Sequence, residues 1–465
     1  MSITTQHPEY IEKFPQWRQV RDCVKGEYYV KLQRTIYLPQ PNVQDTSAEN
    51  LARYEQYHTR ANYLNVTGRT RQGLVGAIFR RPPFTEIPKE IEYMYLDCNG
   101  AGQSIEQFAK WLCGELLETG RAGILVDFPE APENVSLEQA KQLDLRPGIA
   151  GYKAEDIINW RYMTVGGRAL LNLIVLKEQE EIGDNYSHDT EDRYRVLRLD
   201  ENGHYIQTLH KEDGREIARY EPKQANGQPF YEIPFVITGA EDNSPGVDDV
   251  PLYDLSCVNI AHYRNSADYE EGVFIHSQGT LFIDPGKMSP QMFQEANPKG
   301  VLVGSRAGHI LGEGGKAYLL QMEPNNAALV AMQEKEKQMI SIGARLITAT
   351  TSTQTAEEAR INASGESSAL SNLTGNASDA IERSLLFAYQ FSSAAEKAPE
   401  IHFILNQDFF DQRIDPQTRM AKMQELDRGL IAKKDYRDWL RKSGDIQGER
   451  SDDEIDADVE ITGGF

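Results

Sequence analysis

The sequence predicts an α+β protein of several structural units, and three features lead to this expectation. The chain has 465 residues, 40% apolar and 26% charged, which is typical of a folded globular protein. Residues 157–235 carry the short alternating pattern of β-strands. Residues 251–395 instead carry three long helical patterns, and a small β insert separates the first two. A chain of this length exceeds one ordinary core, so we expect about two to four units.

The first quarter of the chain is predicted to be helical. Residues 8–25 form a short amphipathic pattern that includes Trp17, and residues 49–79 form a longer one with a break expected near Gly68. Ser104 and Gln107 are spaced as in a capping box, which predicts that another helix begins there.

A β-rich region follows. We predict strands at 124–128, 169–176, 194–199, 205–209 and 233–237. Asn202-Gly203 is the favoured pair for a hairpin turn between two of these strands. The Pro-, Glu- and Gln-rich residues 129–150 are expected to be exposed, and residues 240–250 have the composition of a linker.

The second half has a different character. A helix predicted over residues 251–275 would be almost 40 Å long at about 1.5 Å per residue. A compact insert at 279–322 is expected to hold three short strands around a small helix at 290–296. A return helix at 325–347, an uncharged hydroxyl-rich loop at 348–354 and a third long helix at 356–395 complete the region. The apolar stripe of the third helix is Leu370, Leu373, Ala377, Ile381, Leu385, Ala388 and Phe391.

The C-terminal part is predicted to contain two short helices and a charged tail. Asp415-Pro416 would begin the first helix, and Gly429 would end it. A second short helix is expected at 435–442. Residues 445–460 contain eight acidic residues and one Arg, which is typical of a solvated, mobile segment.

The formal net charge of −22 argues against a protein that wraps duplex DNA electrostatically. Such proteins need clustered Lys and Arg to displace counterions from phosphates. The acidity either serves solubility or provides a surface that does not adhere to a passing polyanion, and composition does not separate these two interpretations.

The cysteines and the chain start exclude several classes. Cys23, Cys98, Cys113 and Cys257 lie far apart, without a C-x-x-C pair or a histidine at metal-ligand spacing. Neither a disulfide framework nor a zinc site is expected, and Cys113 and Cys257 are predicted to be small buried hydrophobic residues. The polar residues 1–16 do not form a secretion signal, and no run of 18 apolar residues predicts a membrane span. We therefore expect a reducing cytosol as the place of synthesis.

Motifs for catalysis or nucleotide binding are not recognisable. Residues 312–316 (GEGGK) suggest a phosphate-binding loop, but Ile310 and Ala317 stand where a P-loop needs glycine and Ser or Thr, so a tight turn is expected. Neither a G-x-S-x-G elbow nor an H-E-x-x-H pair occurs. His262 and His276 have no assignable partner. The sequence thus predicts a protein that is not an enzyme, with no catalytic residue, metal or cofactor.

The order of parts after residue 250, together with local sequence, resembles the portal proteins of tailed bacteriophages. The local similarity includes the strings Leu252-Tyr253-Asp254-Leu255, His262-Tyr263-Arg264 and Gly343-Ala344-Arg345-Leu346, with Gly120 to Asp127 in the first half. It extends over roughly residues 50–440 and leaves out the acidic tail and residues 129–150.

This resemblance implies a division of the chain into the parts of a portal subunit. The parts would be a mixed α/β wing (1–250), stem helix 1 (251–278), an α/β clip (279–323), stem helix 2 (324–347), a tunnel loop (348–355), a long wing helix (356–405), a helical crown (406–444) and an acidic tail (445–465).

The resemblance also implies a function and partners. About twelve copies would form a ring at one capsid vertex, and double-stranded DNA would pass through it during packaging and ejection, without sequence specificity. Terminase large subunit would dock there, and head-tail adaptor or neck proteins, major capsid protein and scaffold protein would be further partners. The protein would reside in the virion, and in the host cytoplasm during assembly.

Candidate site residues follow from this reading. The tunnel loop would place Thr348, Thr350, Thr351, Ser352, Thr353 and Gln354 near DNA. Lys335, Lys337 and Arg345 are candidates to face the channel, although ordinary pairing with Glu334 and Glu336 along the helix is an equal alternative. Phe282, Val301, Val303 and Tyr318 are candidates for docking through the clip.

Two other classes of function stay open. One is a different virion component, such as a head-tail adaptor or a scaffold, although these are usually shorter and lack two long helices around a β insert. The other is an unrecognised carbohydrate- or nucleotide-modifying enzyme with a β domain and a helical lid.

Overall fold

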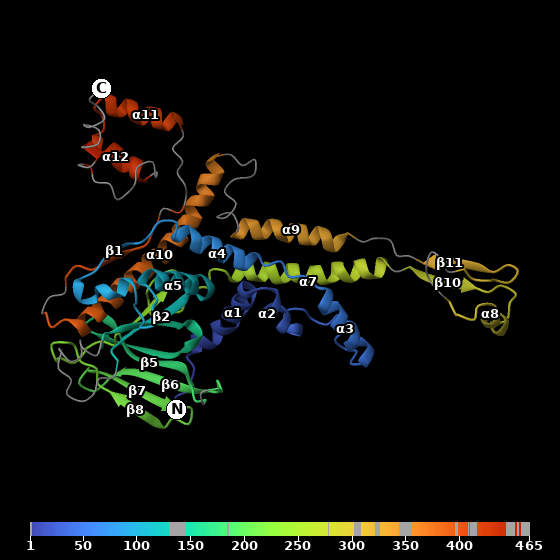
Figure 1. The fold of residues 1–465 in the computed structure, drawn as a ribbon, viewed down its shortest axis with the longest axis horizontal. Helices are drawn as coiled ribbons and strands as arrows, with labels where there is room; N and C mark the ends of the chain where they lie inside the picture. The colour runs from blue at the N-terminus through green and yellow to red at the C-terminus, as the bar shows by residue number, and fades with distance from the viewer. Residues whose placement is uncertain are drawn as a thin grey trace. The chain divides into compact units, whose positions relative to one another are not determined.

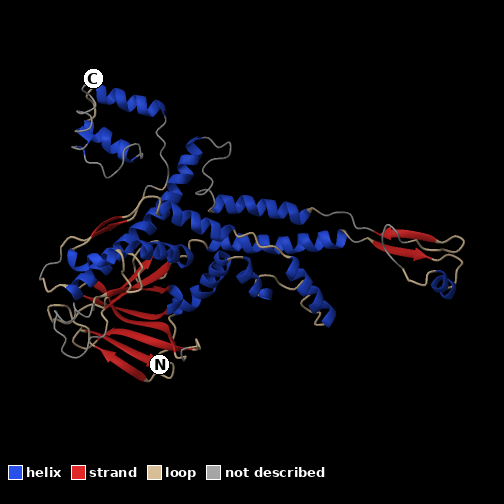
Figure 2. Cartoon of the chain, viewed as in Figure 1, coloured by secondary structure: helices blue, strands red, loops and turns tan. Residues whose placement is uncertain are grey.

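A computed structural model describes residues 2–129, 145–183, 186–277, 279–301, 308–320, 326–343, 356–395, 399–407, 409, 416–442, 452, 455 and 456 (Figure 1). The chain divides into two compact units, residues 1–405 and 406–465. Figure 2 shows that helices and sheets both contribute to the larger unit, which confirms the predicted mixture of α and β structure. The finer division into wing, stem, clip and crown stays a prediction.

The N-terminal helices share a buried cluster that includes Cys23, Val30 and Tyr54, and Trp17 is also fully buried. They are α1 (Pro8–Lys25), α2 (Glu27–Leu32), α3 (Ala48–Arg60) and α4 (Val66–Ile78), with a 3₁₀ turn η1 (Arg34–Ile36). The expected break in this helical region is confirmed, but it lies at residues 61–65, just before Gly68, and Asn65 accepts a hydrogen bond from the Gly68 N–H. Gly68 lies inside α4, where a Cβ would meet the Val24 carbonyl oxygen at 2.5 Å.

Helix α5 (Ile105–Thr119) covers a three-stranded sheet of order β3-β2-β9. The predicted capping box of Ser104 and Gln107 is confirmed. Strand β2 (Arg121–Asp127) begins three residues earlier than predicted. Residues 129–150 were expected to be exposed, but strand β3 (Gly148–Lys153) begins within this range. Residues 130–144 lie outside the described residues. Strand β9 (Phe235–Gly239) completes this sheet.

The predicted β-rich region forms a five-stranded antiparallel meander. Its strands are β4 (Ile157–Val165), β5 (Arg168–Glu181), β6 (Thr190–Leu199), β7 (Tyr205–Lys211) and β8 (Glu216–Tyr220). The predicted Asn202-Gly203 turn joins β6 to β7, and Gly203 has the positive φ of 77° that favours glycine.

Three long helices occupy the second half of the larger unit. They are α7 (Tyr253–His276), α9 (Ala327–Ile342) and α10 (Ala356–Ser392). The predicted stripe of α10 from Leu370 to Phe391 is buried at every position and packs on α5, β2 and β9. This unit also contains a short antiparallel strand pair, β1 (Phe84–Glu86) with β12 (His402–Ile404). Two 3₁₀ segments, η2 (Lys89–Tyr95) and η3 (Ala154–Asp156), lie outside the insert as well.

The insert between α7 and α9 contains β10 (Thr280–Asp284), α8 (Pro290–Ala296) and β11 (Lys316–Leu320). The two strands pair antiparallel with Phe282 opposite Tyr318. Of the third strand expected at 300–304, residues 300 and 301 are not in a strand, and 302–304 lie outside the described residues. Gly312 and Gly315 close the predicted tight turn before β11, with the Gly315 N–H donating to the Gly312 carbonyl.

The smaller unit contains α11 (Pro416–Asp427) and α12 (Lys433–Lys442). Gly429 has a positive φ of 70°, as expected of a residue that follows a helix. In the part of the chain that the structure describes, none of the helices is long and apolar enough to span a membrane.

Candidate functional site: the paired helices α7 and α9

Helix α7 is anchored to the N-terminal helices by a buried asparagine. The Asn259 side-chain oxygen accepts hydrogen bonds from the Thr67 N–H at 3.1 Å, the Thr67 hydroxyl at 2.9 Å and the Tyr63 hydroxyl at 2.9 Å. Its amide nitrogen donates to the Leu64 carbonyl at 2.8 Å. Asn259 therefore provides an acceptor for a backbone N–H in the first turn of α4 that has no partner within that helix, and the contact fixes α7 against α4.

Further contacts continue this anchorage along α7. The Ser266 hydroxyl donates to the Asn62 carbonyl at 2.6 Å and accepts from the Asn62 N–H at 3.0 Å. The Tyr57 hydroxyl donates to Asp268 at 2.7 Å. These contacts attach α7 to the end of α3 and to the segment between α3 and α4.

The sequence underestimated the polar content of this interface. Leu255, Val258 and Ala267 recur at helical spacing, and Leu255 and Ala267 are buried, whereas Val258 is only half-buried. The buried face also carries the polar residues Ser256, Asn259, His262 and Ser266, beside Ile260 and Tyr263. An apolar periodicity search passes over such residues because each is acceptable only with its hydrogen-bond partner in place. Cys257 is exposed, so its predicted burial is wrong; Cys113 is buried as predicted.

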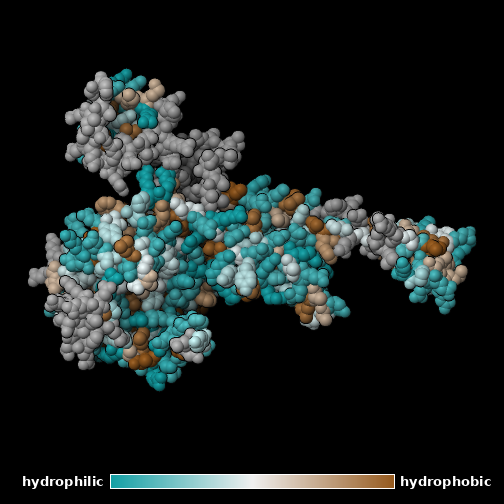
Figure 3. Space-filling model, viewed as in Figure 1, coloured by the Kyte–Doolittle hydropathy of each residue, from teal (hydrophilic) through white to brown (hydrophobic). Residues whose placement is uncertain are grey.

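Helix α9 packs mainly against α7. Met339 is its buried residue, and the Glu336 carboxylate lies 3.4 Å from Nε2 of the buried His262. At the end of α9, a Cβ on Gly343 would lie 3.2 Å from the Thr70 side chain, so the backbone approaches α4 closely there. Other positions of α9 remain open: Val330 is 60% and Ile340 47% exposed. In Figure 3, apolar side chains interrupt the hydrophilic surface along α9.

The lysines predicted to face a channel do not share one side of α9. Lys335 and Lys337 are about 200° apart around the helix. Lys335 is half-buried, whereas Lys337 is exposed and lies 3.9 Å from Glu334. The alternative of ordinary pairing along the helix therefore holds for Lys337. Arg345 and the tunnel-loop candidates Thr348, Thr350, Thr351, Ser352, Thr353 and Gln354 lie outside the described residues.

The docking candidates of the insert are exposed where they are described. Phe282 is 53%, Tyr318 54% and Val301 49% exposed, and Phe282 and Tyr318 face each other across the strand pair. Val303 lies outside the described residues. A two-stranded sheet is only marginally stable by itself, and its unpaired backbone groups can accept another strand.

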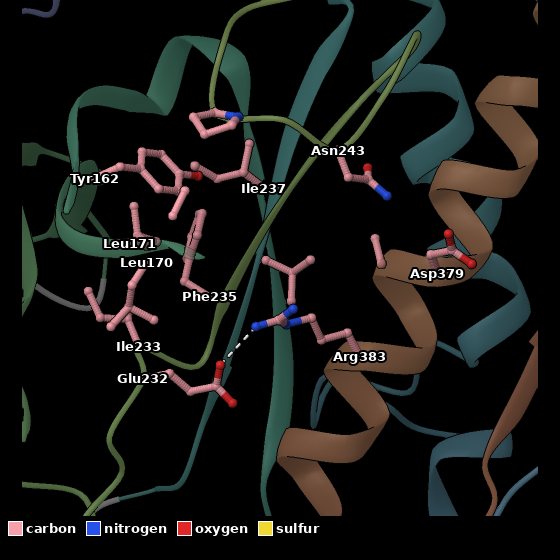
Figure 4. A pocket seen from close by; sticks show the side chains of 14 residues that line it. Tyr162, Leu170, Leu171, Glu232, Ile233, Phe235, Ile237, Asn243, Asp379 and Arg383 are labelled. Carbon is pink, nitrogen blue, oxygen red and sulfur yellow. Dashed lines mark hydrogen bonds and ion pairs between the residues drawn. The ribbon is translucent and has the colours of Figure 1, made fainter. Parts of the chain in front are cut away.

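A separate cavity of about 460 Å³ lies between the β4–β5 hairpin, β9 and α10 (Figure 4). Tyr162, Leu171 and Phe235 contribute to its apolar wall, and the Arg383 guanidinium on α10 pairs with Glu232 at 2.8 Å. Its lining residues include the carboxylates Glu232 and Asp379 but no His, Cys, Ser, Thr or Lys, so a Ser–His or Cys–His pair is not assembled there.

Carboxylate, histidine and cysteine side chains do not gather into a metal-binding group within the described ranges. The polar cluster with the most ion pairs is structural. Arg21 of α1 pairs with Glu115, with Glu118 at 2.8 Å and with Glu155 at 2.9 Å. Burial raises the pKa of Glu115, while hydrogen bonds and charge from Arg21 oppose this shift.

Comparisons with known proteins add a family match over the same region. Residues 251–392 match a family model described as a domain of unknown function, DUF4055. No curated protein matches this sequence.

Two solved structures resemble the chain at low identity. One is described as the neck of an empty GTA particle computed with C6 symmetry; it is 13% identical, with 81% of this chain and 90% of that chain covered and a TM-score of 0.43. The other, the neck of a native GTA particle computed with C12 symmetry, is 12% identical, with 81% and 89% covered and a TM-score of 0.41.

Proposed function

We propose that this chain is a subunit of the ring that connects head and tail in a phage-like particle, and specifically a portal subunit through which DNA passes. The observation that carries the proposal is the antiparallel pair of α7 and α9 with the β10–β11 module inserted between them. Helix α7 is held firmly by its own chain, whereas α9 has an outward side without such support.

An open helix side of this kind suits a wall made of repeated subunits. In a closed ring, each subunit uses one surface against a different surface of the next. Val330 and Ile340 would then be covered by the neighbouring copy, and polar positions such as Lys337 would stay in contact with water. The exposed Phe282 and Tyr318 of the insert would provide a docking surface for terminase or a neck protein.

The acidity of the chain fits transport without adhesion. A ring of subunits that each carry a formal charge of −22 would repel the phosphates of a passing duplex at short range. Salt screens this repulsion beyond about 8–10 Å, so the effect is confined to DNA close to the wall. The acidity thus fits a structural role beside DNA. The resemblance to portal proteins supports about twelve copies, a place in the virion and the absence of catalysis.

Electron microscopy of the purified protein tests the proposal. Negative-stain images are expected to show rings with a central hole. Compact single subunits at every protein concentration would contradict it. If rings form, deletion of residues 350–353 is expected to leave them intact and to impair DNA packaging or retention, which separates a portal from another head-tail adaptor.

A further inference from the structure

The smaller unit concentrates positive charge on one helix of an acidic protein. Helix α12 has the sequence KKDYRDWLRK, with five cations and two acidic residues. Tyr436 and Trp439 pack against each other with ring centroids 5.7 Å apart, and Leu440 is buried, so this apolar side belongs to the unit's own core. Lys433 and Lys434 are exposed.

Two acidic residues near the C-terminus, Asp452 and Asp456, contact this helix. The Arg437 guanidinium donates two hydrogen bonds to the Asp456 carboxylate, one of them at 3.1 Å, and another to the Asp452 carbonyl at 3.4 Å. The Arg437 side chain retains only 14% of its exposure. Lys433 lies one turn before Arg437, about 6 Å along the helix, and therefore on the same side. An anionic group of the chain itself thus occupies the cationic side of α12.

We infer that α12 is a binding surface for the phosphate backbone of duplex DNA, and that the contacts of Asp452 and Asp456 mask it by competing for the same cations. The choice of DNA as the occupant rests on the proposed function, whereas the masking contact rests on the geometry alone. Residues 445–460 carry a net formal charge of −7, from eight acidic residues and one Arg, so the tail is itself a polyanion. A tethered competitor of this kind reduces the apparent affinity for DNA without abolishing it, because it must be displaced before phosphates reach Lys433 and Arg437.

This arrangement has a physical use in a DNA-conducting ring. The net charge of the chain prevents general adhesion, while a masked cationic helix allows weak, sequence-independent contacts when DNA is locally concentrated. Such contacts are expected to be salt-dependent, since both the masking ion pair and the phosphate contacts are electrostatic.

The test compares DNA binding by the full chain with binding by a chain that ends at Gly444. The probe is a short fluorescent duplex of random sequence, followed by anisotropy at several salt concentrations. The truncated chain is expected to bind about tenfold tighter, or more, at low salt. The full-length double variant Asp452→Asn/Asp456→Asn, which keeps the tail length, is expected to shift binding in the same direction.

Matched controls identify the surface. In the truncated chain, the double variant Lys433→Ala/Lys434→Ala is expected to abolish the increase in DNA affinity. The slope of log binding constant against log salt concentration should also decrease in magnitude by about two. The pair Lys110→Ala/Lys299→Ala removes the same charge from exposed positions in the larger unit and is expected to change little.

Two results would overturn the inference: unchanged affinity after both truncation and the double Asn substitution, or equal losses for the two lysine pairs. The outcome is separable from that of the proposed function. If the protein forms rings but truncation does not raise its DNA affinity, only the masking is refuted. If truncation raises the DNA affinity but no rings form, only the portal assignment is refuted.

Discussion

Asn259 and Thr67 are joined by two hydrogen bonds to one side-chain oxygen, and this contact lies at the junction of α7 with α4. Replacing Asn259 with Ala would leave the buried Thr67 N–H without its acceptor, and the Tyr63 hydroxyl would keep only the Cys23 carbonyl at 3.1 Å. We expect a loss of about 2–4 kcal/mol in the free energy of unfolding, measured by urea denaturation. Asn265→Ala, on the same helix at a half-exposed position, is the control and should change it by about 0.5 kcal/mol or less. Equal effects would refute a special role for Asn259.

The Arg21 cluster predicts a large effect from one substitution. Arg21→Ala would leave Glu115, Glu118 and Glu155 close together with less compensating charge, Arg71 remaining beside Glu118 at 2.9 Å. We expect about 3–5 kcal/mol of destabilisation in the same denaturation experiment. Arg34→Ala removes a half-exposed pair with Glu55 and is expected to cost at most about 1 kcal/mol. If Arg21→Ala lowered the free energy of unfolding by no more than Arg34→Ala does, the prediction would be contradicted, and water would have to replace the guanidinium between the carboxylates.

His7 predicts a pH dependence of stability. Its Nδ1 accepts the Glu9 N–H at the start of α1, and its ring stacks on Trp160 at 3.9 Å. Burial lowers the pKa of His7 below 6.5; the Glu9 charge opposes this shift, and the Arg121 charge adds to it. The unfolded chain therefore binds this proton more readily, so the contribution is complete above about pH 6.5 and decreases as the pH falls below it.

The His7→Asn variant provides the comparison for this dependence, since asparagine can cap the helix without titrating. The difference in melting temperature between the natural chain and the variant should change between about pH 7.5 and pH 5, with the natural chain losing more. A constant difference across this range would show that His7 does not contribute through its charge.

The open side of α9 predicts that assembly is sensitive to charge at Ile340. Ile340→Glu should reduce the fraction of protein in rings, because a carboxylate would be placed in a subunit contact, while leaving the helix content unchanged. Ile217→Glu on β8 is the matched control, since Ile217 is 41% and Ile340 47% exposed. Size-exclusion chromatography and negative-stain images measure the outcome. Rings formed equally by both variants would place the contact elsewhere.

The sequence was most informative where one periodicity persists over many residues. The stripe from Leu370 to Phe391 was predicted and is buried throughout, because a single helix face packs on one layer. The capping box at Ser104 and the turn at Gly203 were likewise predictable from local chemistry. The break between α3 and α4 was also predicted, but its position was not: glycine by itself favours a break at Gly68, whereas the Asn65 side chain caps α4 three residues earlier.

The candidate site was predictable in its order of elements and less so in its residues. The partners of Asn259 and His262 could not be predicted, since Thr67 and Glu336 come from distant parts of the chain. The pairing of Asp456 with Arg437 could not be predicted for the same reason: the acidic composition of residues 445–460 was evident, but this contact depends on tertiary structure.

The dependence of α9 on α7 would have a consequence for assembly of the proposed ring. A helix that packs mainly on one other helix of its own chain gains little from intramolecular folding, so its backbone amides should exchange with deuterium sooner than those of α10 in a free subunit. Closure of a ring would then slow that exchange, and part of the binding energy between neighbours would be spent on ordering the segment. Ring formation and completion of the fold would become a single cooperative event, which disfavours partial arcs.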